Sequence, residues 1–304
     1  MDATITDATI VDATTAGTAR AADPAPEARA ARRASREHGL TIEDLSMVFS
    51  VPGGADVHAL SNVNLALAPG ELVSVLGPSG CGKTTLLNII AGFLSPTAGR
   101  VWLNGHEVRG PDAERGMVFQ QGALFEWLSV RRNVAFGPDM AGKPRRETRE
   151  RVDHLLETVG LSGFGDKPVY QLSGGMQQRV ALARCLANDP DIILMDEPLG
   201  ALDALTREKM QGLVLRLWKE TGKTVILITH SVEEALFLGE RLVVMAPRPG
   251  RIHKTYELPF ADRGLVESPR AIKASREFVD VREEILSMIW EMEEEIMGRA
   301  EAGA

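Results

Sequence analysis

One short segment of the chain has the residue types and spacing of a phosphate-binding loop: GPSGCGKTT, residues 77–85. It fits the pattern G-x-x-x-x-G-K-[ST], in which glycines let backbone N–H groups surround phosphate oxygens without a Cβ in the way. An apolar stretch, 72–76, precedes the loop and a helix-compatible run, 84–91, follows it. This strand-to-helix context predicts a site for a nucleoside triphosphate, because the start of a helix adds partial positive charge.

Two side chains of this loop have specific expected roles. Lys83 is expected to reach the β- and γ-phosphates as a point charge, and the Thr84 hydroxyl to ligate Mg²⁺. We expect Cys81 to be a small filler residue rather than a redox sensor. The alternative for the whole segment is an ordinary glycine-rich turn that caps a helix. The predicted nucleotide contacts of the loop are Gly77, Pro78, Ser79, Gly80, Cys81, Gly82, Lys83, Thr84 and Thr85.

A second chemical signal is the pair of carboxylates that ends an apolar strand in DIILMDEP, residues 191–198. Asp196 is expected to hold Mg²⁺ at the nucleotide site. Glu197 is placed to accept a proton from the attacking water, or to orient that water. Adjacent carboxylates at a strand end are also common on protein surfaces, so this pair alone leaves both interpretations open.

A third segment, LSGGMQQR at residues 172–179, lies about twenty residues before that strand. Ser173 and two glycines precede a helix predicted over 177–188, which would give the chain a second helix N-terminus suited to a phosphate. With these three motifs in this order, the chain resembles the ATP-binding subunits of ABC transporters. The resemblance covers about residues 40–290.

The resemblance implies an α/β fold in which a RecA-like P-loop NTPase core carries an antiparallel β subdomain and an α-helical subdomain. We expect a disordered tail over 1–38, an ATPase domain over 39–260 with its helical subdomain at about 121–175, and a C-terminal helical extension over 261–304. Alternating apolar runs over 40–72 and 100–118 predict the antiparallel sheet. The apolar spacing in 145–159 predicts a helix.

The resemblance also assigns roles to residues outside the loop. It implies that Gln120 contacts Mg²⁺ and the water, that His230 bonds the γ-phosphate, and that Phe49 stacks on adenine. A lone histidine at a strand end and an aromatic in a sheet are also often structural. The expected catalytic residues are Glu197, His230 and Gln120, and the expected metal ligands are Thr84, Gln120 and Asp196.

The resemblance further implies a head-to-tail homodimer, because the chain has one phosphate loop and one LSGG segment. In such a dimer Ser173, Gly174, Gly175 and Gln177 contact the ATP held by the other subunit. Asp203 matches a loop aspartate at the same interface. Gly200 stands where the wider family more often has Ser, which weakens inferences about cross-dimer contacts there.

Composition restricts the remaining possibilities. The 304 residues include two cysteines and carry a net charge of −8, without a long basic block in the folded part, which argues against a disulfide framework and a broad nucleic-acid surface. No apolar run reaches the ~18 residues needed to span a bilayer, so we expect any membrane role to be peripheral. Acidic residues near the N-terminus, Asp2, Asp7 and Asp12, argue against an export signal.

Further segments resemble the nitrate, sulfonate and taurine group of ABC importers: GPDAERG at 110–116, EPLGALDALTR at 197–207, LWKETGK at 217–223 and RAIK at 270–273. This implies an ATPase at the cytoplasmic face of the inner membrane, bound to a permease and served indirectly by a solute-binding protein. Residues 124–128, LFEWL, are either a docking surface for the permease or part of the subdomain core.

The transported solute is expected to be taurine or another sulfonate, with nitrate-like or aromatic acids as alternatives. A small-molecule P-loop kinase, a non-transport ABC ATPase and an exporter subunit are the other interpretations of these motifs.

Overall fold

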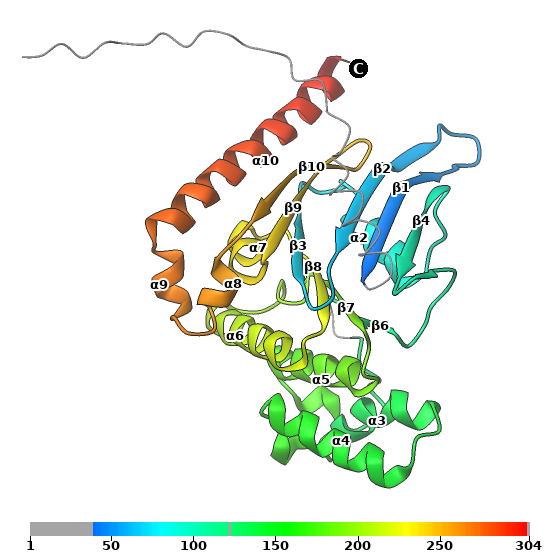
Figure 1. The fold of residues 1–304 in the computed structure, drawn as a ribbon, viewed down its shortest axis with the longest axis vertical. Coiled ribbons are helices and arrows are strands. Elements are labelled where there is room, and N and C mark those ends of the chain that lie inside the picture. Colours follow the sequence, from blue (N-terminus) through cyan, green and yellow to red (C-terminus); the bar gives the residue numbers. More distant parts are fainter. Residues whose placement is uncertain (1–38, 121–122, 303–304) are drawn as a thin grey trace, which may run out of the picture.

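The computed structural model describes residues 39–120 and 123–302 (Figure 1). The predicted disordered tail, 1–38, lies outside the described residues. Within the described ranges no helix combines the length and the apolar character needed to cross a bilayer.

A six-stranded sheet forms the centre of the molecule, in the order β10-β9-β3-β8-β7-β6. The five strands from β9 to β6 are parallel, and β10 pairs antiparallel at one edge. All residues of β3 and β8 are buried, as expected for parallel strands covered on both faces. The strands are β3 (Leu72–Leu76), β6 (Arg115–Val118), β7 (Ile192–Asp196), β8 (Thr224–Ile228), β9 (Arg241–Ala246) and β10 (Arg251–Glu257).

A second sheet is antiparallel, in the order β2-β1-β4-β5, with β1 (Leu40–Phe49), β2 (Val57–Leu67), β4 (Ala98–Leu103) and β5 (His106–Glu107). The helix α2 (Lys83–Ala91) shares one apolar core with this sheet and with one face of the central sheet. The prediction that 100–118 belongs wholly to the antiparallel sheet is wrong at its end. Its last four residues form β6, which pairs parallel with β7 of the central sheet. The sequence could not indicate this partner, because a strand of four residues carries no pattern that reveals it.

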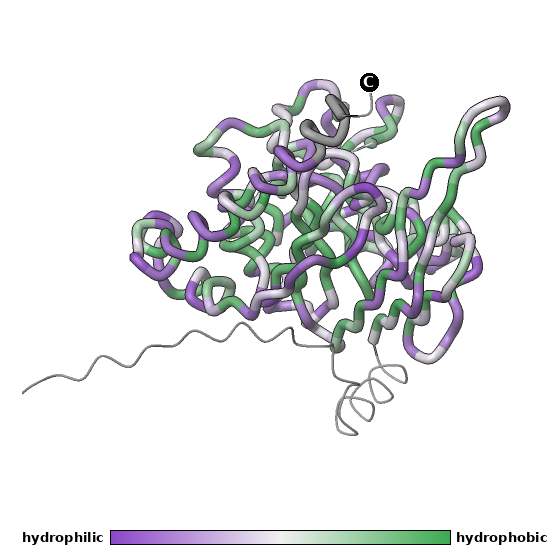
Figure 2. The backbone as a smooth tube through the Cα atoms, turned by 90° about the horizontal axis from the view of Figure 1, so that it is seen from above, coloured by the Kyte–Doolittle hydropathy of each residue, from purple (hydrophilic) through white to green (hydrophobic). Residues whose placement is uncertain are grey.

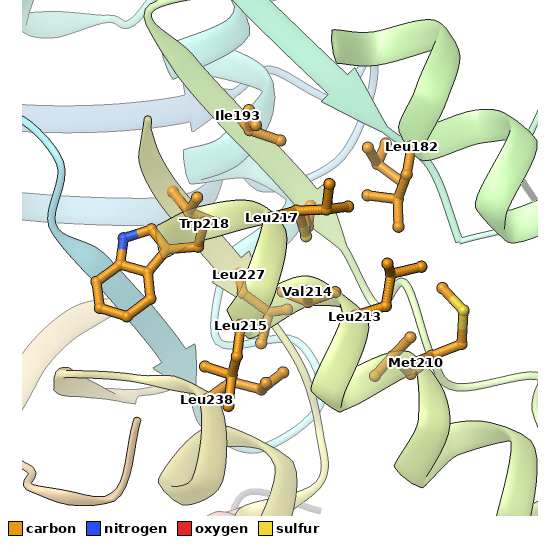
Figure 3. Close-up of a cluster of buried hydrophobic side chains, with 14 of the residues drawn as sticks. Leu182, Ile193, Met210, Leu213, Val214, Leu215, Leu217, Trp218, Leu227 and Leu238 are labelled. Atoms are coloured by element: carbon orange, nitrogen blue, oxygen red, sulfur yellow. The ribbon is translucent and has the colours of Figure 1, made fainter. Parts of the chain in front are cut away.

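The other face of the central sheet is covered by α5 (Gly174–Ala187), α6 (Ala204–Thr221) and α7 (Val232–Leu238). Figure 3 shows how α6 presents a continuous row of apolar side chains to its neighbours, among them Leu227 of β8 and Leu238 of α7. At the end of that row the Trp218 indole N–H donates to the carbonyl oxygen of Gly70 at 2.7 Å. In Figure 2 the apolar segments accordingly concentrate in the interior.

Two further helices, α3 (Val130–Met140) and α4 (Arg145–Thr158), pack on α5 at the lower end of the view in Figure 1. The short 3-10 turns η1 (Ser162–Phe164) and η2 (Val169–Gln171) lead from α4 to α5. The helix predicted over 145–159 is therefore present, and it ends one residue earlier than predicted. This helical group is inserted between the neighbouring strands β6 and β7.

Three helices follow the last strand: α8 (Phe260–Arg263), α9 (Pro269–Lys273) and α10 (Arg276–Ala302). Phe278, Ile285 and Met292 recur every seven residues along α10 and are buried against the core. The Phe278 ring meets Phe260 edge-on, with centroids 4.9 Å apart. Both α9 and α10 contact α7, so the C-terminal helices support the element that follows β8.

Candidate functional site

The phosphate-binding loop connects β3 to α2, as the sequence predicts. Gly80 and Gly82 have φ of +75° and +89°, which side-chain-bearing residues rarely adopt. A Cβ on Gly77 would lie 2.5 Å from the carbonyl oxygen of Met245 and 2.8 Å from the Cys81 sulfur. The loop therefore needs glycine at 80 and 82 for its backbone conformation, and at 77 because there is no room for a Cβ. These glycines leave the backbone N–H groups before α2 unobstructed, which fits a cradle for phosphates.

Lys83 places its positive charge inside this loop. Its Nζ donates hydrogen bonds to the carbonyl oxygens of Gly77 at 2.7 Å and Pro78 at 3.1 Å. The side chain is buried, with 8% of its surface exposed. Burial raises the pKa of the neighbouring Cys81 thiol, and the charge of Lys83 opposes that rise. A thiol with a raised pKa is a poor nucleophile, which agrees with the expected filler role of Cys81.

Asp196 lies at the carboxyl end of β7, next to the start of α2. Burial and the negative charge of Glu197 raise the pKa of this carboxyl, whereas Lys83 and a hydrogen bond from the Thr84 side chain lower it. One hydroxyl and one carboxylate thus meet beside the phosphate loop. Mg²⁺ prefers such hard oxygen ligands and completes its shell with phosphates and water, so the donor set fits the metal.

Glu197 is the residue at which the expected catalytic side chains meet. Its Oε2 accepts a hydrogen bond from the Gln120 amide at 3.2 Å and lies 2.9 Å from Nδ1 of His230. A carboxylate accepts hydrogen bonds, so the His230 tautomer with a proton on Nδ1 can donate in this contact. These residues follow β7, β6 and β8, and the carboxyl ends of these parallel strands lie at one edge of the sheet.

The backbone at Glu197 is held in an unusual conformation, with φ of +45°. Its N–H donates to the carbonyl oxygen of Ile228 at 2.9 Å, which ties the end of β7 to the end of β8. Left-handed backbone at a non-glycine residue is costly and clusters at functional sites. A Cβ on Gly200 would stand 3.7 Å from both Glu197 Oε2 and His230 Cε1, an ordinary contact distance, so the space here does not itself require glycine.

Ser173 and Asp203 both cap helices. The Ser173 hydroxyl accepts from the N–H of Met176 at 3.4 Å, and Asp203 Oδ1 accepts from the N–H of Thr206 at 3.0 Å. The helix α5 begins at Gly174 rather than at the predicted residue 177, because the Ser173 cap allows both glycines to be helical. Gly175 also has a packing reason: a Cβ there would lie 2.5 Å from the Thr206 side chain.

Gln177 and Phe49, both predicted to contact nucleotide, lie away from the phosphate-binding loop's hydrogen bonds within the single chain. The Gln177 amide donates to the carbonyl oxygens of Val169 at 3.1 Å and Leu172 at 3.3 Å, and so holds the turn before α5. Phe49 ends β1 and is 38% exposed, outside the apolar core. The nucleotide roles of both residues stay predictions.

The turn after β9 is a part of the site that sequence reasoning missed. A Cβ on Gly250 would lie 2.2 Å from the carbonyl oxygen of Cys81, and the Gly250 N–H donates to Ala59 at 3.0 Å. The turn therefore lies directly against the phosphate loop. The signal in the sequence was a Pro-Arg-Pro-Gly run at 247–250, which indicates a turn but not what it contacts.

Comparison with known proteins identifies the family. The family described as "ABC transporter" matches residues 60–200. The "Taurine import ATP-binding protein TauB" of Ruegeria pomeroyi is 72% identical over 264 residues, which is 87% of this chain and 98% of that protein. The protein of the same name from Pseudomonas putida is 48% identical over 262 residues, 86% of this chain and 100% of that protein. The chain belongs to the ATP-binding subunits of ABC transporters.

Solved structures agree with this membership of the ABC family. "Dimeric structure of a post-hydrolysis state of the ATP-binding cassette MJ0796 bound to ADP and Pi" has a TM-score of 0.63 and 37% identity, over 72% of this chain and 98% of that one. The cbiO1 protein from Clostridium perfringens has a TM-score of 0.66 and 28% identity, over 84% of this chain and 99% of that one. The predicted fold class and the ATPase activity of an ABC subunit are thereby confirmed, and the small-molecule kinase interpretation is wrong.

Proposed function

We propose that this ABC ATPase energises the import of taurine or another sulfonate. The observation that carries the proposal is the relative from Ruegeria pomeroyi, which is named for taurine import and is 72% identical over 98% of its length. Nitrate-like or aromatic acids remain the alternative solutes within the same importer group. The ATPase itself does not select the solute, so the assignment rests on this relationship and not on the ATP site.

The geometry supports the following reaction. Backbone N–H groups of residues 79–83 and the Lys83 ammonium bind the phosphates of ATP. Glu197 accepts the proton of the attacking water, while Gln120 and His230 hold the carboxylate and orient the water between them. The His230 contact to Glu197 uses Nδ1, and Nε2 can donate to the γ-phosphate when it carries a proton. Thr84, Asp196 and Gln120 would hold Mg²⁺, which would supply charge neutralisation at the phosphates.

A second copy of the chain completes each ATP site in this proposal. Ser173, Gly174, Gly175 and Gln177 of one subunit contact the ATP bound to the phosphate loop of the other, with Asp203 beside them. The capped start of α5 supports this role, because its N-terminal N–H groups and helix dipole favour a phosphate. Similar cassettes are described as dimeric, including one bound to ADP and Pi.

The permease is proposed to dock beside Gln120, at the cytoplasmic face of the inner membrane. A groove of about 400 Å³ lies there between the β6 end and the helical group. The Phe125 ring packs 4.5 Å from Phe136 and 5.3 Å from Trp127, measured between centroids, and Trp127 is 79% exposed. An exposed aromatic cluster beside a groove suits a helix of a partner. A solute-binding protein would act indirectly, and nucleic acid is not a proposed partner.

Reconstitution with the cognate permease and solute-binding protein in proteoliposomes tests the proposal. Taurine-loaded binding protein should stimulate ATP hydrolysis and drive uptake of labelled taurine, and Glu197→Gln should abolish both. Parallel assays with another sulfonate, nitrate and an aromatic acid discriminate the alternatives. Uptake driven by nitrate or an aromatic acid, with none by taurine, would overturn the solute assignment.

A further inference from the structure

Arg207 lies close to the proposed hydrolytic residues, and the mechanism above does not use it. It ends the segment EPLGALDALTR, which begins with Glu197. Arg207 stands in the first turn of α6, and its side chain is partly buried. Among the described residues no carboxylate forms an ion pair with its guanidinium, whose hydrogen bonds all go to the main chain. A partly buried charge is costly to desolvate, so the groups that it does bind require an explanation.

The Arg207 guanidinium holds two carbonyl oxygens of the turn that connects Glu197 to α6. Its Nη2 donates to the Leu202 oxygen at 2.8 Å, and its Nε donates to the Leu199 oxygen at 3.4 Å. Within the turn, the Gly200 N–H donates to the Glu197 carbonyl oxygen and the Leu202 N–H to that of Leu199, each at 3.2 Å. Arginine can serve both carbonyls at once, because its donors form a rigid planar fork.

This turn stands directly against the residues proposed for hydrolysis. A Cβ on Gly200, between the two held carbonyls, would lie 3.7 Å from Glu197 Oε2 and from His230 Cε1. Glu197 has the left-handed φ of +45°, which persists only where its surroundings impose it. Its N–H is fixed by the Ile228 carbonyl oxygen, at 2.9 Å. On its carboxyl side, the turn clamped by Arg207 supplies the second restraint.

The turn has a separate apolar anchor, which does not involve the guanidinium. Leu199 is fully buried and Leu202 is 8% exposed. The Leu202 side chain packs on the start of α5, because its Cδ2 would lie 3.9 Å from a Cβ on Gly174. Burial of two leucine side chains keeps the turn in place against the core. We therefore expect loss of Arg207 to loosen the local main chain rather than to unfold the protein.

We propose that Arg207 is a positioning residue for ATP hydrolysis: it clamps the carbonyl oxygens of Leu199 and Leu202 and so holds the Glu197 carboxylate in its reactive orientation. The proposal rests on the proposed function, in which Glu197 accepts the proton of the attacking water. ATP binding to the phosphate loop does not depend on Arg207, because α6 packs on the face of the central sheet opposite to α2.

Steady-state ATP hydrolysis by Arg207→Gln and Arg207→Lys tests this role. Arg207→Gln loses the charged fork, so kcat should fall about ten-fold or more while KM changes less than about two-fold, because small misplacements of catalytic groups are costly. Arg207→Lys keeps the charge without the planar fork and should recover part of the lost kcat. Arg216→Gln is the matched control on α6, because Arg216 is exposed and has no hydrogen bond or ion pair among the described residues; it should retain kcat.

The same change in a Glu197→Gln background shows whether Arg207 acts through Glu197. Single-turnover hydrolysis by the double variant should be no slower than by Glu197→Gln alone, because a misplaced base costs nothing once the base is gone. Multiplicative losses would overturn the proposal, as would an Arg207→Gln kcat within about two-fold of the parent, or a KM that rises as much as kcat falls. Thermal denaturation checks that each variant is folded, and an Arg207→Lys kcat equal to that of the parent would overturn the need for the fork.

Failure of this inference is distinguishable from failure of the proposed function. If Glu197→Gln alone retained turnover, the assignment of the base would be wrong. If Glu197→Gln lost turnover and Arg207→Gln did not, only the positioning role would be wrong. An error in the transported solute leaves both results unchanged, because the readout is ATP hydrolysis.

Discussion

Replacement of Glu197 by Gln isolates the proton-accepting step from the architecture around it. The side chain of Glu197 is partly exposed, and its Oε2 serves both Gln120 and His230. A glutamine oxygen can accept the same two hydrogen bonds, so the fold and the ATP site should persist. What is lost is basicity, and a positioned general base contributes about 10²–10⁴-fold, which corresponds to ~3–5 kcal/mol at 1.36 kcal/mol per decade.

The measurement is phosphate release at saturating ATP and Mg²⁺, alongside nucleotide binding and size-exclusion chromatography. Glu197→Gln should hydrolyse ATP at least about 100-fold more slowly, bind it with unchanged affinity, and accumulate as a dimer with ATP. Turnover above one tenth of the parent value would refute Glu197 as the base. A protein that binds ATP and stays monomeric would refute the shared ATP site instead, so the two ideas fail separately.

Three further predictions address the phosphate-binding loop, the C-terminal helix α10 and Glu234, a carboxyl group buried in α7. Gly77→Ala should weaken ATP binding at least about ten-fold, since the added Cβ would meet backbone atoms of the loop's surroundings. The control Gly163→Ala adds a Cβ that meets nothing within 4 Å, so it should leave ATP affinity unchanged. Equal affinities of the two variants in equilibrium titrations would contradict this. Phe278→Ala should lower the free energy of unfolding by ~3–5 kcal/mol in urea titrations, because the ring is fully buried. Replacement of the exposed Trp290 by Ala should lower it by less than ~0.5 kcal/mol. Similar losses for the two variants would show that α10 is not anchored by its buried face. Burial raises the pKa of the Glu234 carboxyl in the folded protein to about 7, from its ordinary 4.5. The free energy of unfolding therefore includes a favourable contribution that is fully present below about pH 4.5 and is lost as pH rises through 7. Glu234→Gln has no such titration, so it should gain ~3 kcal/mol of stability relative to the parent between pH 5 and 8, and parallel stability profiles would contradict that.

The parts of the site carried by local motifs could be predicted from the sequence. The phosphate loop, the strand before it and the pair Asp196 and Glu197 follow from short-range rules, because glycine geometry and strand burial act within a few residues. The expectation that Gln120, Glu197 and His230 meet came from the family resemblance. The structure brings them together at one edge of the sheet.

Features that depend on long-range packing could not be predicted in the same way. The partner of β6 and the contact of Gly250 with the phosphate loop each depend on segments more than 70 residues apart. Gly175 illustrates the limit: the sequence marks it as a phosphate contact, and only the structure shows that it also lets α5 approach α6. Glu234 and Glu233 are adjacent glutamates, and nothing local distinguishes the buried one from the exposed one.

The place of the helical insertion has a consequence for how such ATPases diversify. The insertion leaves the sheet at its edge strand, β6, and returns to β7, while the residues proposed for hydrolysis follow β3, β6, β7 and β8. A connection at an edge can lengthen or change its surface without threading between strands. The residues proposed for hydrolysis and the proposed permease-docking surface can therefore change independently, so that similar ATPase cores can serve different permeases. Exchanging α3 and α4 between relatives should redirect permease choice while the rate of ATP hydrolysis stays that of the host sheet.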